Sequence, residues 1–509
     1  MWVTATLLVL ALQAGISPVL EFPAAGDPGA HDEFILGVIA LHSSAYVDAA
    51  EHFRAAAKLD PAFVMAYWGE AMTFNHPFWN QQDIAGARRS LLKLGPTRAA
   101  RAAKARSVRE RGYLNAVEIL YGEGDRDRRD FQFADAMKKL AFDNPADYEA
   151  AAFYVLALLS SRRAGDQTYP QTQVTAAAIL HSILEKYPDH PGALHYLMHT
   201  YDDPEHAAHA LDAARKYEKV AVPDSSFHAI HMPSHVYAQL GMWADVVRTN
   251  QEAFDASDRW VKSKKLPLAG RDYHSLDYLH YAQMQLGQYR KARETLSGFA
   301  GTNAQAAVMA ARFAIETGDW DVLGSFPANN AIPELLFARG LAAIQKADIE
   351  GARRVSSTLD SLIQADLAAS RRVHASMVDL LMKLLGSRIA LAERRLVDAD
   401  RLASEALQLE HGIDIPAELN GIVKPAAEFF GEILLETKRN GEAAAQFAAS
   451  LQQSPKRALS MLGLARATGE RRAYQELADM WSDADPEEPV VREVRNFLRQ
   501  DAFHLHLRH

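Results

Sequence analysis

Two stretches of the chain, one near each end, share a single order of small, large and helix-ending residues. In the first stretch, Gly37 and Ala49 are the small residues, Phe53 is the large one and Pro61 closes the unit. The second stretch repeats this order with Gly431, Ala443, Phe447 and Pro455. Small residues let two antiparallel helices approach closely, an aromatic ring fills the space beside them, and proline ends the second helix. The pattern therefore predicts stacked pairs of helices.

A turn signature recurs between these stretches, in which a glycine stands two residues before an aromatic residue. It occurs at Leu240–Trp243, Leu286–Tyr289 and Thr317–Trp320. The sequence lacks runs of alternating Val, Ile or Thr closed by Asn-Gly or Asp-Gly, which would indicate β-hairpins. On these motifs the chain resembles the tetratricopeptide repeat (TPR) family. The resemblance implies an all-α fold, a TPR-like right-handed superhelical solenoid of antiparallel helix pairs.

The resemblance covers most of residues 33–480, and the composition divides the chain into four parts. We expect a signal peptide or anchor over 1–20, a Pro/Gly-rich linker over 21–32, the solenoid over 33–480 and a charged capping tail over 481–509. Within the solenoid, the Arg-rich segment 81–130 fits no regular unit and is expected to be an irregular insertion. Residues 340–409 have helical periodicity but little of the repeat signature.

The N-terminal segment has the character of a targeting sequence. Its apolar run over Leu7–Leu12 is followed by the small residues Ala14, Gly15 and Ser17, although no Lys or Arg precedes the run. We expect an exported protein, periplasmic or secreted, that is cleaved between Gly15 and Ala30. The alternatives are an uncleaved membrane anchor, because the segment approaches the roughly 20 residues of a membrane span, or a misassigned start and a cytoplasmic protein.

Composition excludes several classes of function. The net charge of -9 and the isoelectric point near 6.1 provide no basic field for nucleic acid or anionic lipid. Because the chain has no cysteine, it has no disulfide, no thiolate metal site and no cysteine nucleophile. The sequence also lacks a phosphate-binding loop, a dinucleotide-binding glycine motif and a serine nucleophile elbow.

Histidines are concentrated in one part of the chain. Eleven of the 20 histidines fall between His181 and His280, and four of them form two pairs spaced four residues apart: His195 with His199, and His231 with His235. This spacing places both imidazoles of a pair on one helical face. Each member of the second pair lies 36 residues after its counterpart. The repeat register therefore places both pairs on the concave face.

This arrangement predicts a metal site. His195, His199, His231 and His235 are the expected ligands around one ion, and Asp277 or His274 from the next repeat completes the coordination sphere. A ligand set of nitrogen and oxygen suits Zn, Fe, Cu or Mn. The zinc-protease motif is excluded, because neither pair has a glutamate directly after its first histidine.

Other residues are expected to line the same concave face as contacts for a ligand. These are His228, Tyr281, Asp202, Asp203, Trp68, Asn75, His76 and Arg271. Each has a plainer interpretation: the two aspartates belong to a helix-ending turn before Pro204, aromatic residues of a repeat pack between repeats, and an arginine in a loop is a solvated charge.

Two hypotheses for the function follow. In the first, the concave histidine cluster binds a transition metal or a polar ligand and supports metal-dependent hydrolysis or oxidation. In the second, a metal-free TPR adaptor binds a peptide, protein or small-molecule partner in the groove. The stretches HYLMHTYDDPEHA, from His195, and HMPSH, from His231, resemble those of bacterial TPR-domain proteins of undefined activity. That resemblance implies a fold and a binding surface, without a reaction.

Overall fold

A computed structural model describes residues 20–161, 169–220, 226–299, 303–413 and 423–506. The chain forms two compact units. The first comprises the described parts of 1–202, 206–236 and 252–266, and the second those of 203–205, 237–251 and 267–509. The predicted targeting segment lies in residues 1–19, outside the described residues. Among the described helices, none is long and apolar enough to cross a membrane.

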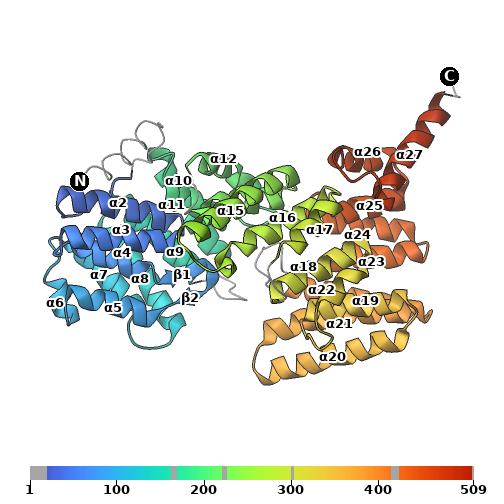
Figure 1. Cartoon of the computed structure of the whole chain (residues 1–509), viewed down its shortest axis with the longest axis horizontal. Coiled ribbons are helices and arrows are strands. Elements are labelled where there is room, and N and C mark those ends of the chain that lie inside the picture. Colours follow the sequence, from blue (N-terminus) through green and yellow to red (C-terminus); the bar gives the residue numbers. More distant parts are fainter. Residues whose placement is uncertain (1–19, 162–168, 221–225, 300–302, 414–422, 507–509) are drawn as a thin grey trace. The chain divides into compact units, whose positions relative to one another are not determined.

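The first unit is almost entirely helical, as predicted (Figure 1). Its elements are α2 (Pro28–His42), α3 (Tyr46–Leu59), α4 (Val64–Met72), β1 (Asn75–His76), η1 (Pro77–Trp79), β2 (Gln81–Gln82), α5 (Ile84–Leu94), α6 (Arg98–Ala102), α7 (Val108–Leu120), α8 (Arg126–Asp143), α9 (Tyr148–Ser160), α10 (Tyr169–Lys186), α11 (Pro191–Thr200), η2 (Ala207–Ala210), α12 (Leu211–Val220) and α13 (Phe227–His231).

Helices α14 (Pro233–Gln239) and α15 (Trp243–Ser263) each contribute residues to both units. The second unit continues with η3 (Leu268–Gly270), α16 (Tyr273–Gln285), α17 (Tyr289–Ser297), α18 (Ala304–Thr317), η4 (Trp320–Ser325), α19 (Pro333–Gln345), α20 (Ile349–Ala368), α21 (Arg372–Ala392), α22 (Leu396–Gly412), α23 (Ala426–Glu436), α24 (Asn440–Gln453), α25 (Ala458–Thr468), α26 (Arg471–Met480) and α27 (Pro489–His506). Consecutive helices from α19 to α27 pack against one another.

An aromatic ring held between two glycines defines the repeat in both units. A Cβ atom on Gly37 or on Gly69 would overlap the ring of Phe53, and Phe447 lies in the same way between Gly431 and Gly463. In each case the glycines stand 16 residues before and after the phenylalanine. The ring thus packs against the first helix of its own pair and the first helix of the next pair, which is the TPR-like arrangement predicted. The fold is an all-α helical repeat.

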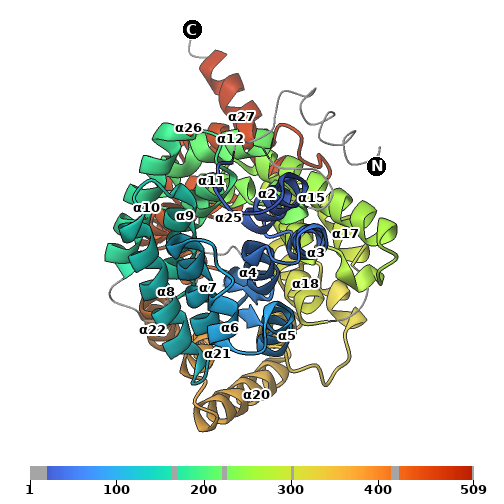
Figure 2. The same ribbon diagram turned by 90° about the vertical axis from the view of Figure 1, so that its left-hand side faces the viewer.

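The irregular segment is shorter than predicted and is itself largely helical. Helix α4 contacts α7 directly, while the β1–η1–β2 hairpin, α5 and α6 lie between them in the sequence (Figure 2). Helices α7 and α8 then pack as an ordinary consecutive pair. The insertion therefore occupies residues 75–107 instead of 81–130. Its two short strands pair Asn75 with Gln82 and His76 with Gln81.

Part of the predicted linker belongs to the core. Helix α2 already begins at Pro28, and the Phe22 side chain is only 1% exposed. Its ring lies 5.0 Å from Phe34, 5.9 Å from Trp68 and 5.1 Å from Tyr113, measured between centroids. An aromatic residue buried in this way favours order over a flexible connection. The predicted capping tail is also helical, and Val491 and Val494 of α27 are buried against the end of the second unit.

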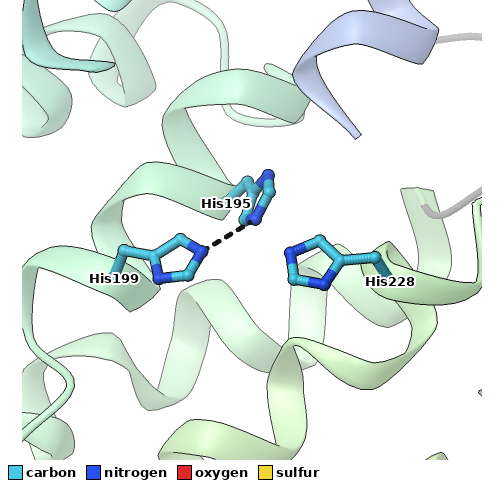
Figure 3. Close-up of side chains that lie close together, drawn as sticks. All are labelled: His195, His199 and His228. Carbon is cyan, nitrogen blue, oxygen red and sulfur yellow. Dashed lines mark hydrogen bonds between the residues drawn. The ribbon is translucent and has the colours of Figure 1, made fainter. Parts of the chain in front are cut away.

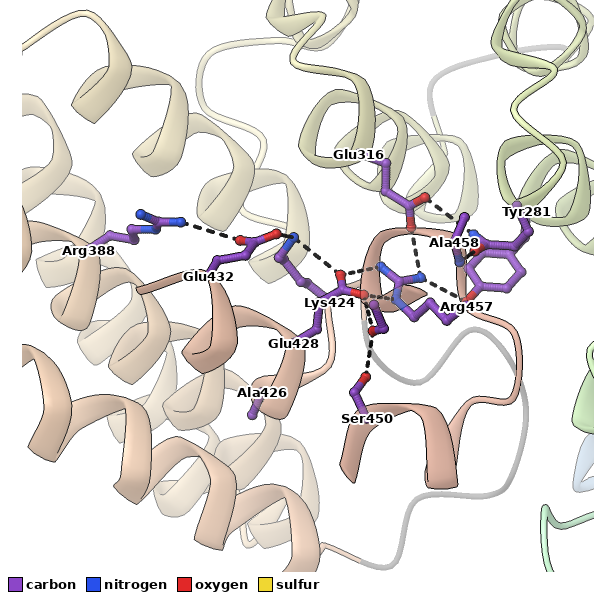
Figure 4. A network of polar contacts seen from close by, with 12 residues as sticks. Tyr281, Glu316, Arg388, Lys424, Ala426, Glu428, Glu432, Ser450, Arg457 and Ala458 are labelled. Carbon is purple, nitrogen blue, oxygen red and sulfur yellow. Dashed lines mark hydrogen bonds and ion pairs between the residues drawn. The ribbon is translucent and has the colours of Figure 1, made fainter. Parts of the chain in front are cut away.

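The second unit holds a buried ionic network centred on Arg457 (Figure 4). The guanidinium donates to both carboxylate oxygens of Glu428 at 2.8 and 2.9 Å, and it also contacts Glu316 and the hydroxyl of Tyr281 at 2.9 Å each. Arg457 is 1% exposed and Glu428 is fully buried. Burial alone raises the pKa of Glu428, but Arg457 and Lys424 hold it well below its usual range. The network links α16, α18 and α23 to the start of α25.

Replacing Arg457 with Ala should destabilise the protein by about 3–5 kcal/mol, because it leaves the buried Glu428 carboxylate without its main counter-charge. Urea unfolding monitored by circular dichroism measures the change. The control is Arg472→Ala, which removes an ion pair whose arginine side chain is 88% exposed and should leave the unfolding midpoint nearly unchanged. Equal midpoints for both variants would contradict a structural role for the network.

Candidate functional site: a buried imidazole cluster

Helix α11 brings the first histidine pair into the interior of the first unit. Pro191 occupies its first turn, and the ring nitrogen Nδ1 of His190 accepts a hydrogen bond from the backbone N–H of Ala193, which caps the helix. His195 and His199 then lie on one face of α11, with their Nε2 atoms 3.1 Å apart. His195 is fully buried, in contrast to the exposed groove predicted for this pair.

The protonation of His195 is fixed by the end of α2. Helices α2 and α11 are in contact, and Nδ1 of His195 lies 2.6 Å from the carbonyl oxygen of His42, the last residue of α2. Carbonyl groups in the last turn of a helix have no partner within the helix. Because a carbonyl oxygen only accepts, Nδ1 of His195 carries the proton. In the neutral ring, Nε2 therefore presents its lone pair.

His228 of α13 faces this pair from another helix (Figure 3). One ring nitrogen each of His195, His199 and His228 lies within 4.8 Å of the others. His228 is 8% exposed, and its Nε2 atom is buried without a hydrogen-bond partner. A buried polar nitrogen without a partner is costly. This is the orphaned group expected at a site for a ligand or ion.

The short hairpin after α4 covers the cluster with two aromatic rings. Phe78 stacks on His199 with ring centroids 3.6 Å apart, and Trp79 lies 4.6 Å from His228. Both aromatic residues belong to η1. They shield one side of the imidazoles from water and so lower the local dielectric around them.

Burial keeps the imidazoles of His195 and His228 neutral. Desolvation lowers the pKa of His195 to about 4, despite the hydrogen bond to His42 that raises it. Desolvation also lowers the pKa of His228 far below its usual value, and the neighbouring histidines lower it further. Neutral imidazole is the form that coordinates a metal ion.

The second pair, His231 and His235, spans the interruption between helices α13 and α14. His231 ends α13, and α14 begins at Pro233. The two Nε2 atoms nevertheless lie 2.9 Å apart. Nδ1 of His235 lies 2.7 Å from the carboxylate of Asp202. The prediction placed both pairs on one ion, whereas the structure groups His195 and His199 with His228.

A second cluster of titratable residues lies beside the first. Glu149 receives hydrogen bonds from Nε2 of His42 at 2.7 Å and of His190 at 3.0 Å. The remaining nitrogen of His42 accepts from the Tyr196 hydroxyl at 2.9 Å, and that of His190 accepts from Ala193. Each ring nitrogen thus has a partner other than a second imidazole, unlike the inner nitrogens of the two histidine pairs.

Predicted residues of the next repeat belong to the second unit, and two of them, Asp277 and Tyr281, have other contacts there. Asp277 forms a buried ion pair with Arg312 at 2.7 Å, which differs from the ligand role predicted for it. The Tyr281 hydroxyl belongs to the Arg457 network. Arg271 lies 3.0 Å from the Tyr273 hydroxyl, and the His274 ring lies 5.0 Å from Tyr278 between centroids.

The remaining predicted ligand contacts divide between core, turn and surface. Trp68 is fully buried among aromatic rings, which corrects its predicted place on an open face. Asn75 bonds to Gln82 across the hairpin. Nε2 of His76 donates to the carbonyl oxygen of Thr73 in its own turn, and His76 lines a surface hollow of about 490 Å³. Asp203 accepts from the backbone of Glu205, as the turn interpretation predicts.

Sequence reasoning missed His42, Glu149, His190 and Phe78. The contacts of His42 to the α11 region span about 150 residues of sequence, so no local spacing of residues predicts them. Gly192 gave one sign, since a Cβ there would overlap the His42 ring. A glycine near the start of a helix is unfavourable unless close packing requires it.

Comparison with known proteins gives a limited result. No protein-family model matches the chain, and no curated protein matches it. Among solved structures, it is similar to a tetratricopeptide repeat protein from Parabacteroides merdae, at 14% identity over 54% of this chain and 97% of that one, with a TM-score of 0.29. It is also similar to the human IFIT1 dimer with m7Gppp-AAAA, at 12% identity over 91% and 90%, with a TM-score of 0.37. It is also similar to the P58(IPK) TPR domain, at 16% identity over 88% of this chain and 98% of that one, with a TM-score of 0.22.

Acidification tests the Glu149 network. The two histidines lower the pKa of Glu149 to about 2 although its burial opposes this. Because the folded-state pKa lies below the unfolded value, the stabilisation is fully present above pH 4.5 and is lost as pH falls towards 2. Glu149→Gln should therefore cost about 3 kcal/mol at pH 7, and its difference from wild type should shrink below pH 4.5.

Urea unfolding midpoints between pH 7 and pH 3 measure this difference. Glu123→Gln is the matched control, because the Glu123 side chain is 94% exposed and should unfold like wild type throughout. A Glu149→Gln deficit that stays constant down to pH 3 would rule out the ionised carboxylate as its source.

Proposed function

We propose that the first unit binds a transition metal ion through His195, His199 and His228. The observation that carries the proposal is the hydrogen bond from Nδ1 of His195 to the His42 carbonyl oxygen, because it turns the Nε2 lone pair of His195 towards His199. Metal-binding histidines usually donate their second ring N–H to a carbonyl or carboxylate in this way.

The spacing of the nitrogens is compatible with an ion. Two imidazole ligands at 2.0–2.1 Å from a tetrahedral ion lie about 3.3 Å from each other, and the two Nε2 atoms of α11 are 3.1 Å apart. The unpartnered Nε2 of His228 supplies a third donor. Neutral imidazoles suit Zn, Cu and Fe, and Mn less well.

The proposed site is compatible with the metal-dependent hydrolysis or oxidation expected from the sequence. Three histidine ligands leave one coordination position open, which would allow a bound water or a small polar ligand to be activated in hydrolysis or oxidation. A metal-free adaptor is the competing function. The burial of His195 and His228 favours the metal, since an adaptor groove needs side chains that a peptide can reach.

Replacing His199 and His228 with Ala should abolish tight binding of Zn²⁺ at this site. His199 is partly exposed, so the helix content should remain. We expect wild-type protein to bind at least one Zn²⁺ per chain in calorimetric titration at pH 7, and the double variant to lose that equivalent or bind it at least about 100-fold more weakly.

His181→Ala is the matched control, because His181 is an exposed histidine of α10 in the same unit. It should bind Zn²⁺ as wild type does. If wild type binds no more Zn²⁺ than the His199→Ala/His228→Ala variant, the metal proposal fails and the adaptor function gains support.

We also propose that the protein is exported and cleaved between Gly15 and Leu20. This range is narrower than the Gly15–Ala30 range predicted from the sequence. The burial of Phe22 and the hydrogen bond from Arg109 to the Pro23 carbonyl oxygen support it, because a mature chain without these residues would lose these contacts. N-terminal sequencing of native protein should find a start upstream of Phe22. A chain that keeps Met1–Ala14, or one that begins after Pro23, would contradict this proposal.

A further inference from the structure

We propose that His231 and His235 bind a second metal ion beside the first, so that the imidazole cluster is a two-ion centre. This inference rests on the proposed function, because the second ion is placed next to the one held by His195, His199 and His228. It departs from the sequence prediction, in which both histidine pairs share a single ion.

The contact between His235 and Asp202 orients the second pair. A carboxylate oxygen of Asp202 lies 2.7 Å from Nδ1 of His235. An ionised carboxylate only accepts, so Nδ1 carries the proton and Nε2 presents its lone pair towards His231. A carboxylate, an imidazole and an ion in this order are a common arrangement in metal sites, where the carboxylate fixes the ring and makes it a better donor.

His231 has the matching geometry. Its Nε2 atom lies 2.9 Å from that of His235, close to the separation of two ligands on one ion. Its Nδ1 atom lies 3.3 Å from the Ser234 hydroxyl, which can accept a hydrogen bond from the ring as well as donate one. Both rings are buried, with exposures of 0% for His231 and 4% for His235.

The two groups are close enough to act together. The ring centroids of His199 and His235 are 6.0 Å apart, and so are those of His228 and His231. Ions bound about 2 Å from the facing nitrogens would lie within a few ångströms of each other, near the spacing of roughly 3.5–4 Å in known two-metal sites. The ligand class that suits such a pair is an oxygen donor, either water or a small oxyanion, that bridges both ions.

The neighbouring network of His42, Glu149 and His190 provides an internal contrast. It also places two imidazoles against a carboxylate, but its ring nitrogens face a carboxylate, a hydroxyl or a backbone N–H instead of each other. In the second pair, Asp202 contacts the outer nitrogen of His235, and the inner nitrogens of His235 and His231 face each other at 2.9 Å. We therefore assign the second ion to the His231 and His235 pair.

Titration of the metal-free full-length protein with Co²⁺ tests the inference, with calorimetry for stoichiometry and electron paramagnetic resonance for proximity. We expect two equivalents in wild type. The resonance of the first Co²⁺ should change when the second binds, because adjacent paramagnetic ions couple. His231→Ala/His235→Ala should bind one equivalent without that coupling.

Asp202→Asn serves as a second variant that keeps both rings. It should weaken the second equivalent by roughly 10–100-fold and leave the first unchanged. A single equivalent in wild type, unaffected by the changes at His231, His235 and Asp202, would overturn the two-ion centre while the proposed function stands. Failure of wild type to bind any Co²⁺ or Zn²⁺ would overturn both.

Discussion

The hydrogen bond between Nδ1 of His195 and the carbonyl oxygen of His42 makes the orientation of the imidazole cluster depend on helix packing. It satisfies a carbonyl at the end of α2 that has no partner within the helix, and it fixes which nitrogen of His195 carries the proton. The contact requires α2 and α11 to pack closely, and Gly192 provides the space for the His42 ring. The orientation of the imidazole cluster therefore depends on the packing of α2 against α11.

A helical repeat suits such a site because its packing holds the helices at set distances. A phenylalanine between two glycines fixes the separation of successive first helices, as Phe53 does between Gly37 and Gly69. Side chains on adjacent first helices are then held at constant distances. The cluster departs from this regularity where the hairpin bearing Phe78 and Trp79 packs on the imidazoles, and it adds to the burial that lowers the pKa of His195 and His228.

Local sequence patterns predicted the helical repeat and part of the imidazole cluster. The residues that they did not predict act through long-range contacts. The spacing of His195 and His199 indicated their shared face, and the three glycine turns at Gly241, Gly287 and Gly318 do adopt left-handed backbone angles. Between residues 340 and 409 the corresponding turns place Ala347 and Arg394 in that conformation, so the glycine signature is missing although the turn is present. Phe22 and Glu149 act through partners far away in the sequence, which spacing alone does not reveal.

The most direct test of the account is anomalous diffraction at the zinc absorption edge from crystals of the protein loaded with Zn²⁺. We expect a peak about 2.0–2.1 Å from the Nε2 atoms of His195, His199 and His228, with the His42 carbonyl oxygen still accepting a hydrogen bond from His195. Crystals whose peaks all lie away from these three nitrogens, or imidazoles that remain bonded to each other with no peak between them, would contradict the claim that this repeat holds a metal ion.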